Sequence, residues 1–268
     1  MDWKQIDYSR INILSEVLPS SFNEFKILQV SDLHNRKFGR DNEYLMEYIY
    51  ISNADIIVMT GDIYTGGEQH MISFEKFIKE ISKITPVYYV LGNHEFSSGR
   101  VQWVKEVLKD ADARLLDDEI ISIYKGEQRI QVLGMSDPFK SSVSSNFFER
   151  EKGVSERFKQ RLDSLMKKSD EKEFRLLLSH RPEFAKEYAK YGIDLVLSGH
   201  AHGGQFRLPI IGGVFAPHQG FFPKYSEGVH QINKTKIVIS RGLGNSTIPF
   251  RINNRPELLE IVLNGFSM

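Results

Sequence analysis

Two histidines separated by one residue follow a short apolar run in the last third of this sequence. The run Leu195–Leu197 is short enough to be a buried strand, and the small residues after it lead directly to His200 and His202. A neutral imidazole carries a free nitrogen lone pair near neutral pH and is the commonest protein ligand for metals. The pair predicts a metal site only if other segments bring ligands to the same place.

Four other apolar runs end in the same kind of residue. Their ends carry Asp32 and His34, Asp62, Asn93 and His94, and His180. Taken singly, each of these residues has an ordinary structural role, such as capping a helix or shaping a turn. In layered α/β folds, however, the turns after the strands meet at one crevice, so the set as a whole favours one shared site.

The residue types in this set predict two adjoining metal sites. A carboxylate can bridge two cations and offset their repulsion, and Asp62, alone at its strand end, is the natural bridge. One metal would take Asp32, His34 and Asp62, and the other would take Asp62, Asn93 and His180. Each would add one of His200 and His202 and keep an open place for solvent. Nitrogen and oxygen ligands admit manganese, iron and zinc.

Strands and helices that alternate along the chain must position these residues. Apolar runs predict strands over 25–30, 56–59, 87–91, 174–178 and 194–197. Amphipathic spacing predicts helices over 41–53, with Asp41 as a cap, and over 70–83 and 100–112. Pro182 opens a short helix that continues to Tyr191. This alternation is typical of an α/β fold.

The remaining segments have a different character. The runs 120–124 and 130–133 flank Lys125-Gly126-Glu127 and predict an antiparallel hairpin, and 147–168 predicts a helix with a solvated, charged face. The last third returns to strands over 236–240 and 258–263. Residues 1–25 show no clear periodicity.

Composition limits the classes of partner and cofactor. Hydrophobic residues make up 41% and charged residues 26%, and no Pro/Ser/Gly-rich linker interrupts the chain, which favours a single domain over 1–268. The 35 basic and 35 acidic residues balance, so no nucleic acid or anionic membrane recognised by bulk charge is indicated. Because there is no cysteine, any metal must be held by nitrogen and oxygen.

The sequence also predicts a cellular location. No apolar run reaches the roughly 18 residues that a membrane-spanning helix needs, and residues 1–20 lack a signal-peptide pattern. We therefore expect a soluble, cytoplasmic protein, or a membrane-associated one if a native anchor precedes residue 1. The sequence carries no signal for an oligomeric state.

The motifs, taken in order, resemble the calcineurin-like metallophosphoesterase superfamily over residues 27–202. They are Asp32-x-His34, Gly61-Asp62, Gly92-Asn93-His94-Glu95, His180 and Gly199-His200-Ala201-His202. The resemblance implies a four-layer αββα sandwich, with two mixed β-sheets flanked by helices, around a dinuclear centre. It further implies that His202 joins the metal of Asp32, that His200 joins the metal of His180, and that His94 is the catalytic histidine.

Flanking residues look like the bacterial branch related to UDP-2,3-diacylglucosamine hydrolases. They are Gly203-Gly204-Gln205, the Pro/Gly/aromatic segment to Tyr225, Ser240–Gly244 and Arg251–Glu257. Members of that branch often begin with a membrane anchor or export signal, which is not seen here. Glu95 stands where many members of the superfamily have aspartate, and we still expect it to orient His94.

The chemistry implied is hydrolysis of a phosphodiester or pyrophosphate bond. A hydroxide shared by the two metals would attack phosphorus in line. His94, outside both coordination shells, would steady the phosphoryl oxygens or protonate the leaving oxygen. The substrate would be a small-molecule phosphate ester or a lipid-linked one, with peripheral membrane contact as a further expectation. Substrate contacts are predicted at Arg241, Arg251 and His218, although surface ion pairs are the alternative for the arginines.

A Gly/Pro-rich loop just past the histidine pair carries four aromatic residues, Phe206, Phe215, Phe221 and Phe222. Packing within the loop is the favoured interpretation. The alternative is an apolar rim for an acyl or aromatic group.

Two other functions remain as alternatives. A non-catalytic, metal-binding interaction scaffold of the same fold would tend to have lost ligands, whereas every expected ligand is present here. A single-metal hydrolase of the amidohydrolase kind would need His-x-His after the first strand, where this chain has Asp32-x-His34.

Overall fold

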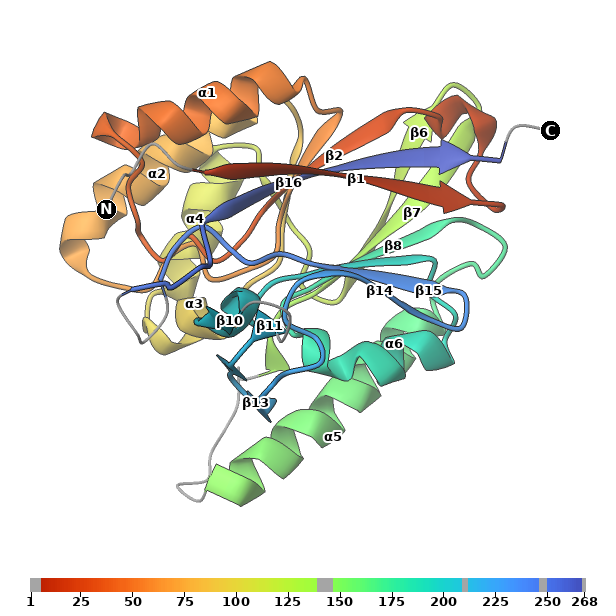
Figure 1. Cartoon of the computed structure of the whole chain (residues 1–268). Coiled ribbons are helices and arrows are strands. Elements are labelled where there is room, and N and C mark those ends of the chain that lie inside the picture. Colours follow the sequence, from red (N-terminus) through yellow and green to blue (C-terminus); the bar gives the residue numbers. More distant parts are fainter. Residues whose placement is uncertain (1–5, 139–146, 209–211, 246–249, 267–268) are drawn as a thin grey trace.

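Two six-stranded sheets face each other in the computed structural model, which describes residues 6–138, 147–208, 212–245 and 250–266 (Figure 1). The first sheet has the order β1 (Asp7–Ser15), β16 (Glu257–Gly265), β2 (Phe25–Val30), β3 (Ile56–Met59), β4 (Val87–Tyr89) and β5 (Arg114–Leu115). The second has the order β14 (Gly228–Ile232), β15 (Thr235–Ile239), β9 (Leu195–Ser198), β8 (Arg175–Ser179), β7 (Gln128–Met135) and β6 (Glu119–Lys125).

Both sheets are mixed. Strands β2 to β5 run parallel, whereas β16 lies antiparallel to β2 and carries β1 parallel at the edge. In the second sheet β7, β8, β9 and β15 run parallel, with β6 and β14 antiparallel at the two edges. The short strand pairs β10 (Arg207–Leu208) with β11 (Gly212–Gly213) and β12 (Phe215–Ala216) with β13 (Gly220–Phe221) lie outside both sheets.

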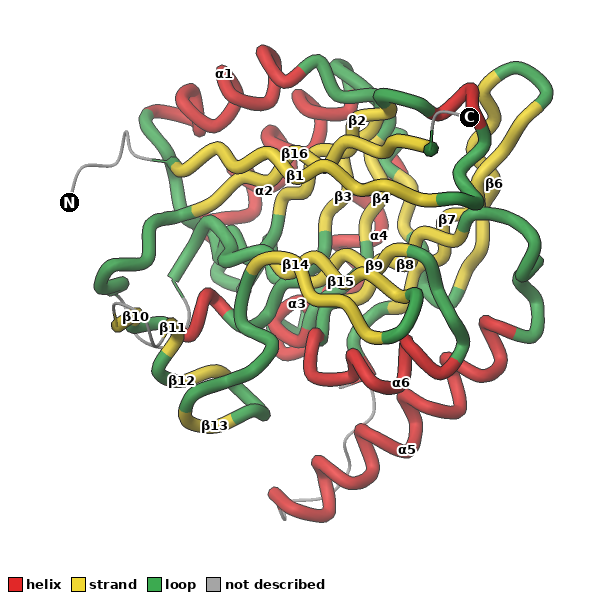
Figure 2. The backbone as a smooth tube through the Cα atoms, turned by 45° about the vertical axis from the view of Figure 1, so that its right-hand side comes forward, coloured by secondary structure: helices red, strands yellow, loops and turns green. Residues whose placement is uncertain are grey.

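Helices cover the outer face of each sheet (Figures 1 and 2). The helices α1 (Glu43–Ser52), α2 (Glu68–Ser82) and α4 (Val101–Asp110) pack on the first sheet, where Leu28 contacts their apolar faces. The helices α5 (Phe147–Met166) and α6 (Ala185–Lys190) pack on the second sheet through Leu177 and its neighbours. Between the sheets, Ile27 of β2 and Leu176 of β8 belong to one buried core. The four-layer αββα sandwich is therefore confirmed.

Burial on both faces explains why the central strands read as unbroken apolar runs. All four residues of β3 are buried, because helices cover one face of the sheet and the second sheet covers the other. The predicted bounds of β2 and β3 and the predicted hairpin of β6 and β7 are confirmed. The short helix after Pro182 is divided into a single 3₁₀ turn and α6.

At the N-terminal side one expectation was wrong, and one strand was not predicted. Asp41 does not cap a helix: the backbone φ angles of Asp41 and Asn42 are 55° and 66°, so α1 begins only at Glu43, and the Asp41 carboxylate instead pairs with Lys76 at 2.8 Å. Residues 7–15, which show no periodicity, form the edge strand β1. Its partner β16 comes from the other end of the chain, so no local pattern is needed to hold β1 in place.

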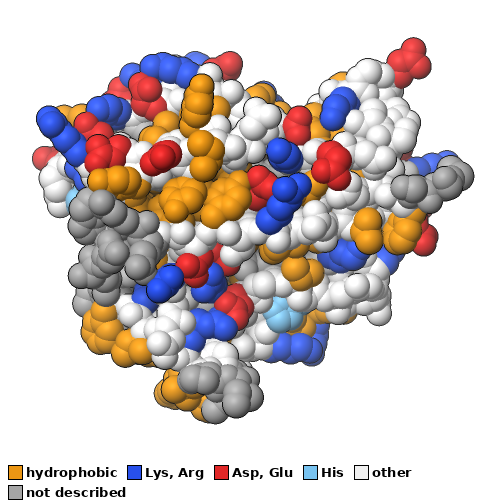
Figure 3. Space-filling model, turned by 45° about the horizontal axis from the view of Figure 1, so that its top comes forward, with side chains coloured by type: hydrophobic (Ala, Val, Ile, Leu, Met, Phe, Trp, Pro, Cys, Tyr) orange, Lys and Arg blue, Asp and Glu red, His pale blue; other side chains and the backbone are white. Residues whose placement is uncertain are grey.

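Among the described residues, no helix is both long and apolar enough to cross a bilayer. On the face seen in Figure 3, lysine and arginine side chains alternate with aspartate and glutamate rather than gathering by sign. This mixture agrees with the balanced charge of the sequence.

Candidate metal centre

The turns after β2, β3, β8 and β9 meet at one edge of the two sheets and are hydrogen-bonded to one another. The backbone N–H of Asp32 donates to Gly61 O at 3.0 Å, and the N–H of Gly199 donates to His180 O at 3.1 Å. The N–H of His200 donates to the Asp32 carboxylate at 3.1 Å and so joins the two sheets. Asn93 and His94 enter from α3 (Asn93–Ser97), which follows β4.

Five of the eight residues predicted at this edge have a left-handed backbone. Their φ angles lie between 49° and 67°, and they are Asp32, His34, Asp62, His200 and His202. A non-glycine residue in this region costs of order 1–3 kcal/mol, and such strain gathers at functional sites. Here it turns each side chain inward from its strand end.

Two glycines allow the turns to approach this closely. A side chain on Gly92 would collide with the carboxylate of Asp62, and one on Gly199 would collide with Ser31 and Asp32. Sterics therefore explain why the motifs have glycine at these two positions.

A first group of ligand atoms gathers around His34 and His202. Their Nε2 atoms are 3.0 Å apart. His202 Nε2 lies 3.4 Å from Asp32 Oδ1, and His34 Nε2 lies 3.8 Å from Asp62 Oδ2. Three of these residues, Asp32, His34 and His202, form one cluster with the spacing of metal ligands.

A second group gathers around His180. Its Nε2 lies 3.0 Å from His200 Nδ1, 3.2 Å from Asn93 Oδ1 and 3.2 Å from Asp62 Oδ2. The oxygen Asp62 Oδ2 thus belongs to both groups. The structure places His202 in the first group and His200 in the second, which is the division that the resemblance implies.

The donor chemistry of both groups fits a metal ion. Burial lowers the pKa of His34 to about 3 and holds the pKa values of His200 and His202 well below their usual range, so these rings are neutral at pH 7. Ring nitrogens of these histidines converge with carboxylate oxygens, an arrangement that a cation stabilises.

The charge of the second group also favours a cation. Burial acts to lower the pKa of His180, but the Asp62 carboxylate outweighs it and raises that pKa to about 10. In the metal-free chain, the Asp62 carboxylate therefore attracts the proton that makes the His180 ring an imidazolium. Behind the ring, His180 Nδ1 donates to Thr60 O at 2.7 Å, which leaves Nε2 as the nitrogen that faces the centre.

His94 lies apart from the buried ligands. Its side chain is 34% exposed and its Nε2 is 4.0 Å from Asp62 Oδ2. Its ring packs edge-on against His34 with centroids 4.8 Å apart, and its backbone N–H donates to Asp62 Oδ1 at 2.8 Å. A nitrogen next to the shared carboxylate and open to solvent can reach a molecule bound at the centre.

Glu95 acts differently from the expectation that it orients the His94 ring. Its buried carboxylate accepts hydrogen bonds at 2.6–3.1 Å from four backbone N–H groups and one hydroxyl, those of Asp62, Ile63, Tyr64, Gly92 and Tyr89. It therefore ties the turn of Asp62 to the start of α3 through the backbone.

Replacing Glu95 by alanine should lower the free energy of unfolding of the metal-free chain by at least about 3 kcal/mol. The change leaves several buried donors without an acceptor, each costing about 1–3 kcal/mol. Urea unfolding measures this, with the exposed Glu68→Ala as control, since Glu68 pairs with Arg100 alone among the described residues. A loss below about 1 kcal/mol would mean that this turn holds its shape without the carboxylate.

The three predicted substrate contacts have different surroundings. Arg241 forms ion pairs with Asp7 and Glu257 at 3.0 Å each, which agrees with the alternative to a substrate contact. Arg251 donates to backbone carbonyls, and its Nη2 lies 3.2 Å from His202 Nδ1. His218 stacks on His200 with ring centroids 5.3 Å apart. Arg251 and His218 thus border the two ligand groups, whereas the Arg241 guanidinium is engaged by carboxylates.

The four loop aromatics show features of both interpretations, packing and an apolar rim. Phe221 and Phe222, on and beside β13, are 74% and 61% exposed, although Phe215 contacts the Phe221 ring and Phe206 contacts Phe250. These rings form an apolar surface on the segment that follows the histidine pair.

Some residues that support the ligand groups were not predicted from the sequence. Asn254 donates to the carbonyls of His202 and Gln205 at 2.7 Å and 3.1 Å and so holds the turn of the histidine pair. The buried pair of Arg181 and Asp137 lies directly after His180, with Nε and Oδ2 2.5 Å apart. Arg181 is adjacent to a ligand in sequence, and Asn254 lies in the flanking segment Arg251–Glu257, but neither was assigned a role.

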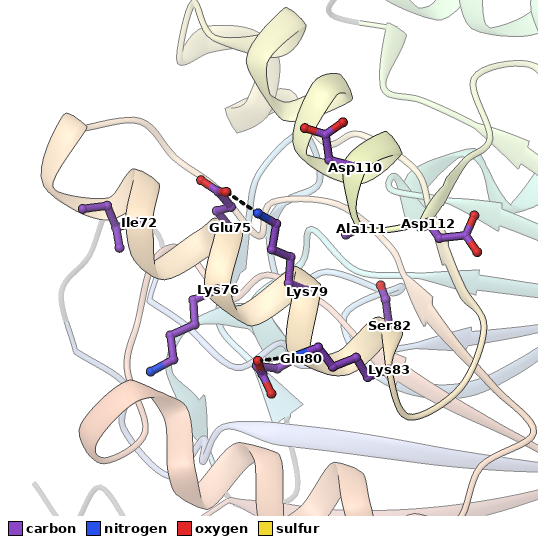
Figure 4. A pocket seen from close by; sticks show the side chains of 10 residues that line it. All are labelled: Ile72, Glu75, Lys76, Lys79, Glu80, Ser82, Lys83, Asp110, Ala111 and Asp112. Atoms are coloured by element: carbon purple, nitrogen blue, oxygen red, sulfur yellow. Dashed lines mark hydrogen bonds and ion pairs between the residues drawn. The ribbon is translucent and has the colours of Figure 1, made fainter.

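A cavity of about 610 Å³ lies elsewhere, between α2 and α4 (Figure 4). Its lysines are paired: Lys79 with Glu75 and Lys83 with Glu80 line the opening, and Lys76 reaches Asp41. Neither the seven residues of the two ligand groups nor His94 lines this cavity.

The site and the four-layer fold define a metallophosphoesterase, and comparison with known proteins agrees. Residues 25–204 match the model of the calcineurin-like phosphoesterase family, so the chain belongs to this family of metal-dependent hydrolases that act on phosphoesters.

Relatives match most of the chain. The metallophosphoesterase YkuE of Bacillus subtilis is 28% identical, covering 97% of this chain and 86% of the relative. The phosphodiesterase YaeI of Escherichia coli is 26% identical, covering 89% and 82%. Among solved structures, the phosphopantetheinyl hydrolase of Mycobacterium tuberculosis covers 81% of this chain and 89% of its own, with a TM-score of 0.50 at 14% identity. That likeness concerns the fold alone.

Proposed function

We propose that this chain, acting as a single domain, hydrolyses a phosphodiester or pyrophosphate bond with two metal ions. The observation that carries the proposal is the shared oxygen Asp62 Oδ2, which lies 3.8 Å from His34 Nε2 in one ligand group and 3.2 Å from His180 Nε2 in the other. Asp32, His34, Asp62 and His202 would hold one ion, and Asp62, Asn93, His180 and His200 the other.

Two bound ions would supply a water of lowered pKa and neutralise charge on the phosphoryl oxygens. Side chains of the chain itself would make the other contacts to the substrate. The half-exposed ring of His94 contacts the phosphoryl group or gives a proton to the leaving oxygen. Arg251, beside His202, would reach a phosphate oxygen through the second N–H of Nη1, because Nε and Nη2 already donate to Gly244 O and contact His202. His218 completes this border from the side of His200.

The substrate proposed is a phosphate ester that carries an apolar group, either a small molecule or one linked to lipid. The exposed rings of Phe221 and Phe222 support this, since they offer an apolar rim beyond the ligands. The likeness to the phosphodiesterase YaeI supports a diester. We extend the proposal to a pyrophosphate on the proposed relationship to UDP-2,3-diacylglucosamine hydrolases. The same proposal includes a cytoplasmic location, with contact to a membrane surface as its alternative.

Metal analysis combined with an activity assay tests the function. Protein from the native host should contain two metal ions per chain, of manganese, iron or zinc, and should hydrolyse bis-p-nitrophenyl phosphate. A panel of phosphate esters with and without acyl chains then tests the apolar rim. One ion per chain would favour a single-metal hydrolase, and bound metal without hydrolysis would favour an interaction scaffold.

A further inference from the structure

Three buried polar side chains that hold no ligand position form a continuous hydrogen-bonded line to Asp32. Gln29 Nε2 lies 3.0 Å from Thr60 Oγ1, Thr60 Oγ1 lies 2.7 Å from Ser31 Oγ, and Ser31 Oγ lies 2.5 Å from Asp32 Oδ2. All four side chains belong to residues with no exposed surface. The line crosses from β2 to the turn after β3 and back.

The chemistry of its two ends sets the direction of every proton in this line. Gln29 Nε2 also donates to the carbonyl of Ser198 at 2.9 Å, and a carbonyl only accepts, so the amide nitrogen must be the atom that faces Thr60. The ionised carboxylate at the other end likewise only accepts. Thr60 therefore donates to Ser31, and Ser31 donates to Asp32 Oδ2.

This direction divides the two oxygens of Asp32 between two tasks. The N–H of His200 donates to both oxygens at 3.1 Å, but Oδ2 in addition accepts from Ser31, whereas Oδ1 is the oxygen that lies 3.4 Å from His202 Nε2 in the first ligand group. Thr60 also touches the second group, but only through its backbone carbonyl, which accepts from His180 Nδ1. A change of its side chain therefore acts through Asp32, which is a ligand of the first group.

We propose that Gln29, Thr60 and Ser31 form a one-way hydrogen-bond line that holds Asp32 Oδ2 and aims Oδ1 at the first ligand group, so that these positioning residues set the metal affinity of that group. The proposal rests on the proposed two-metal function. Ser31 stands one hydrogen bond behind the ligand, and Thr60 acts on the ligand through Ser31. Outer partners of metal ligands change metal affinity by about 10–100-fold when they are lost.

The test titrates the metal-free full-length chain with Mn²⁺ and follows free Mn²⁺ by electron paramagnetic resonance. Thr60→Val keeps the shape of the side chain and removes the hydroxyl, and it should weaken one of two binding steps by about 10–100-fold. Asp32→Asn identifies that step, because it removes a ligand of the first group. Thr60→Ser restores the hydroxyl and should restore the affinity, and Ser31→Ala should repeat the defect of Thr60→Val.

Ser198→Ala is the matched control. Its hydroxyl is equally buried at the end of β9 but has no hydrogen-bond partner among the described residues, so both steps should stay unchanged. Wild-type affinity in Thr60→Val and Ser31→Ala would overturn the proposal, and so would an equal loss in both steps that Thr60→Ser does not restore. A wild-type chain that binds no Mn²⁺ in either step would overturn the proposed function itself.

Discussion

Asp62→Asn should release metal from both ligand groups and lower the hydrolysis of bis-p-nitrophenyl phosphate at least about 10³-fold, equivalent to about 4 kcal/mol of transition-state stabilisation. The reason is the shared oxygen: Oδ2 faces His34 in one group and His180 in the other, so one substitution weakens both. Asparagine keeps the size of the side chain. Its carbonyl oxygen can still accept the N–H that His94 donates to Oδ1.

Metal content and turnover, measured together, test whether the Asp62 carboxylate is shared by two metal ions. The control is Asp55→Asn at the opposite end of β3, where the carboxylate accepts only the N–H of Lys26 among the described contacts. That variant should keep both metal content and activity. An Asp62→Asn chain that retained two metals and near wild-type turnover would contradict the shared-ligand assignment.

The sequence predicted the strand ends well because the central strands are buried on both faces. Such strands must be apolar throughout, so the apolar run 56–59 marks β3 without ambiguity, and the first polar residues after it belong to the site. The edge strand β1 is not buried on both faces and need not be apolar throughout. Eight of its nine residues are partly or fully exposed, and they pair with β16, roughly the whole chain length away, so their pattern carries little information.

The division of the histidine pair could not be derived from spacing alone. His200 and His202 are one residue apart, and each had an equal claim to either metal. In the folded chain the His202 ring lies with Asp32 and His34, whereas the His200 ring lies with Asp62 and His180. Only the tertiary structure, or the resemblance to a known family, distinguishes the two.

The supporting contacts were even less visible in the sequence. Ser31 and Thr60 stand next to the motifs, and a hydroxyl beside a ligand is a signal that could have been used. Glu95 was noticed, but its role was assigned to a ring when it serves the backbone of two turns. The partners of Arg241 come from both ends of the chain, so its ion pairs with Asp7 and Glu257 could not be read locally.

His94→Ala should retain both metal ions and lose about 10²–10⁴-fold in turnover. The ring is 34% exposed, and its Nε2 is 4.0 Å from the shared oxygen, farther than any contact within the two ligand groups described above. Removing it therefore takes a group that can touch substrate while leaving the ligands in place. The control is His230→Ala on β14, whose ring contacts the carbonyl of Glu227.

The leaving group distinguishes the two roles that remain for His94. If the ring protonates the leaving oxygen, the loss should be large for an alkyl phosphodiester and small for a nitrophenyl ester, because nitrophenolate departs without a proton. If it steadies the phosphoryl oxygens, both substrates should lose equally, as expected for a donor aimed at developing charge. Full turnover of both substrates by the metal-loaded variant would exclude His94 from the reaction. Metal loss in the same variant would instead make it a ligand, which its cluster with His34 and Asp62 also allows.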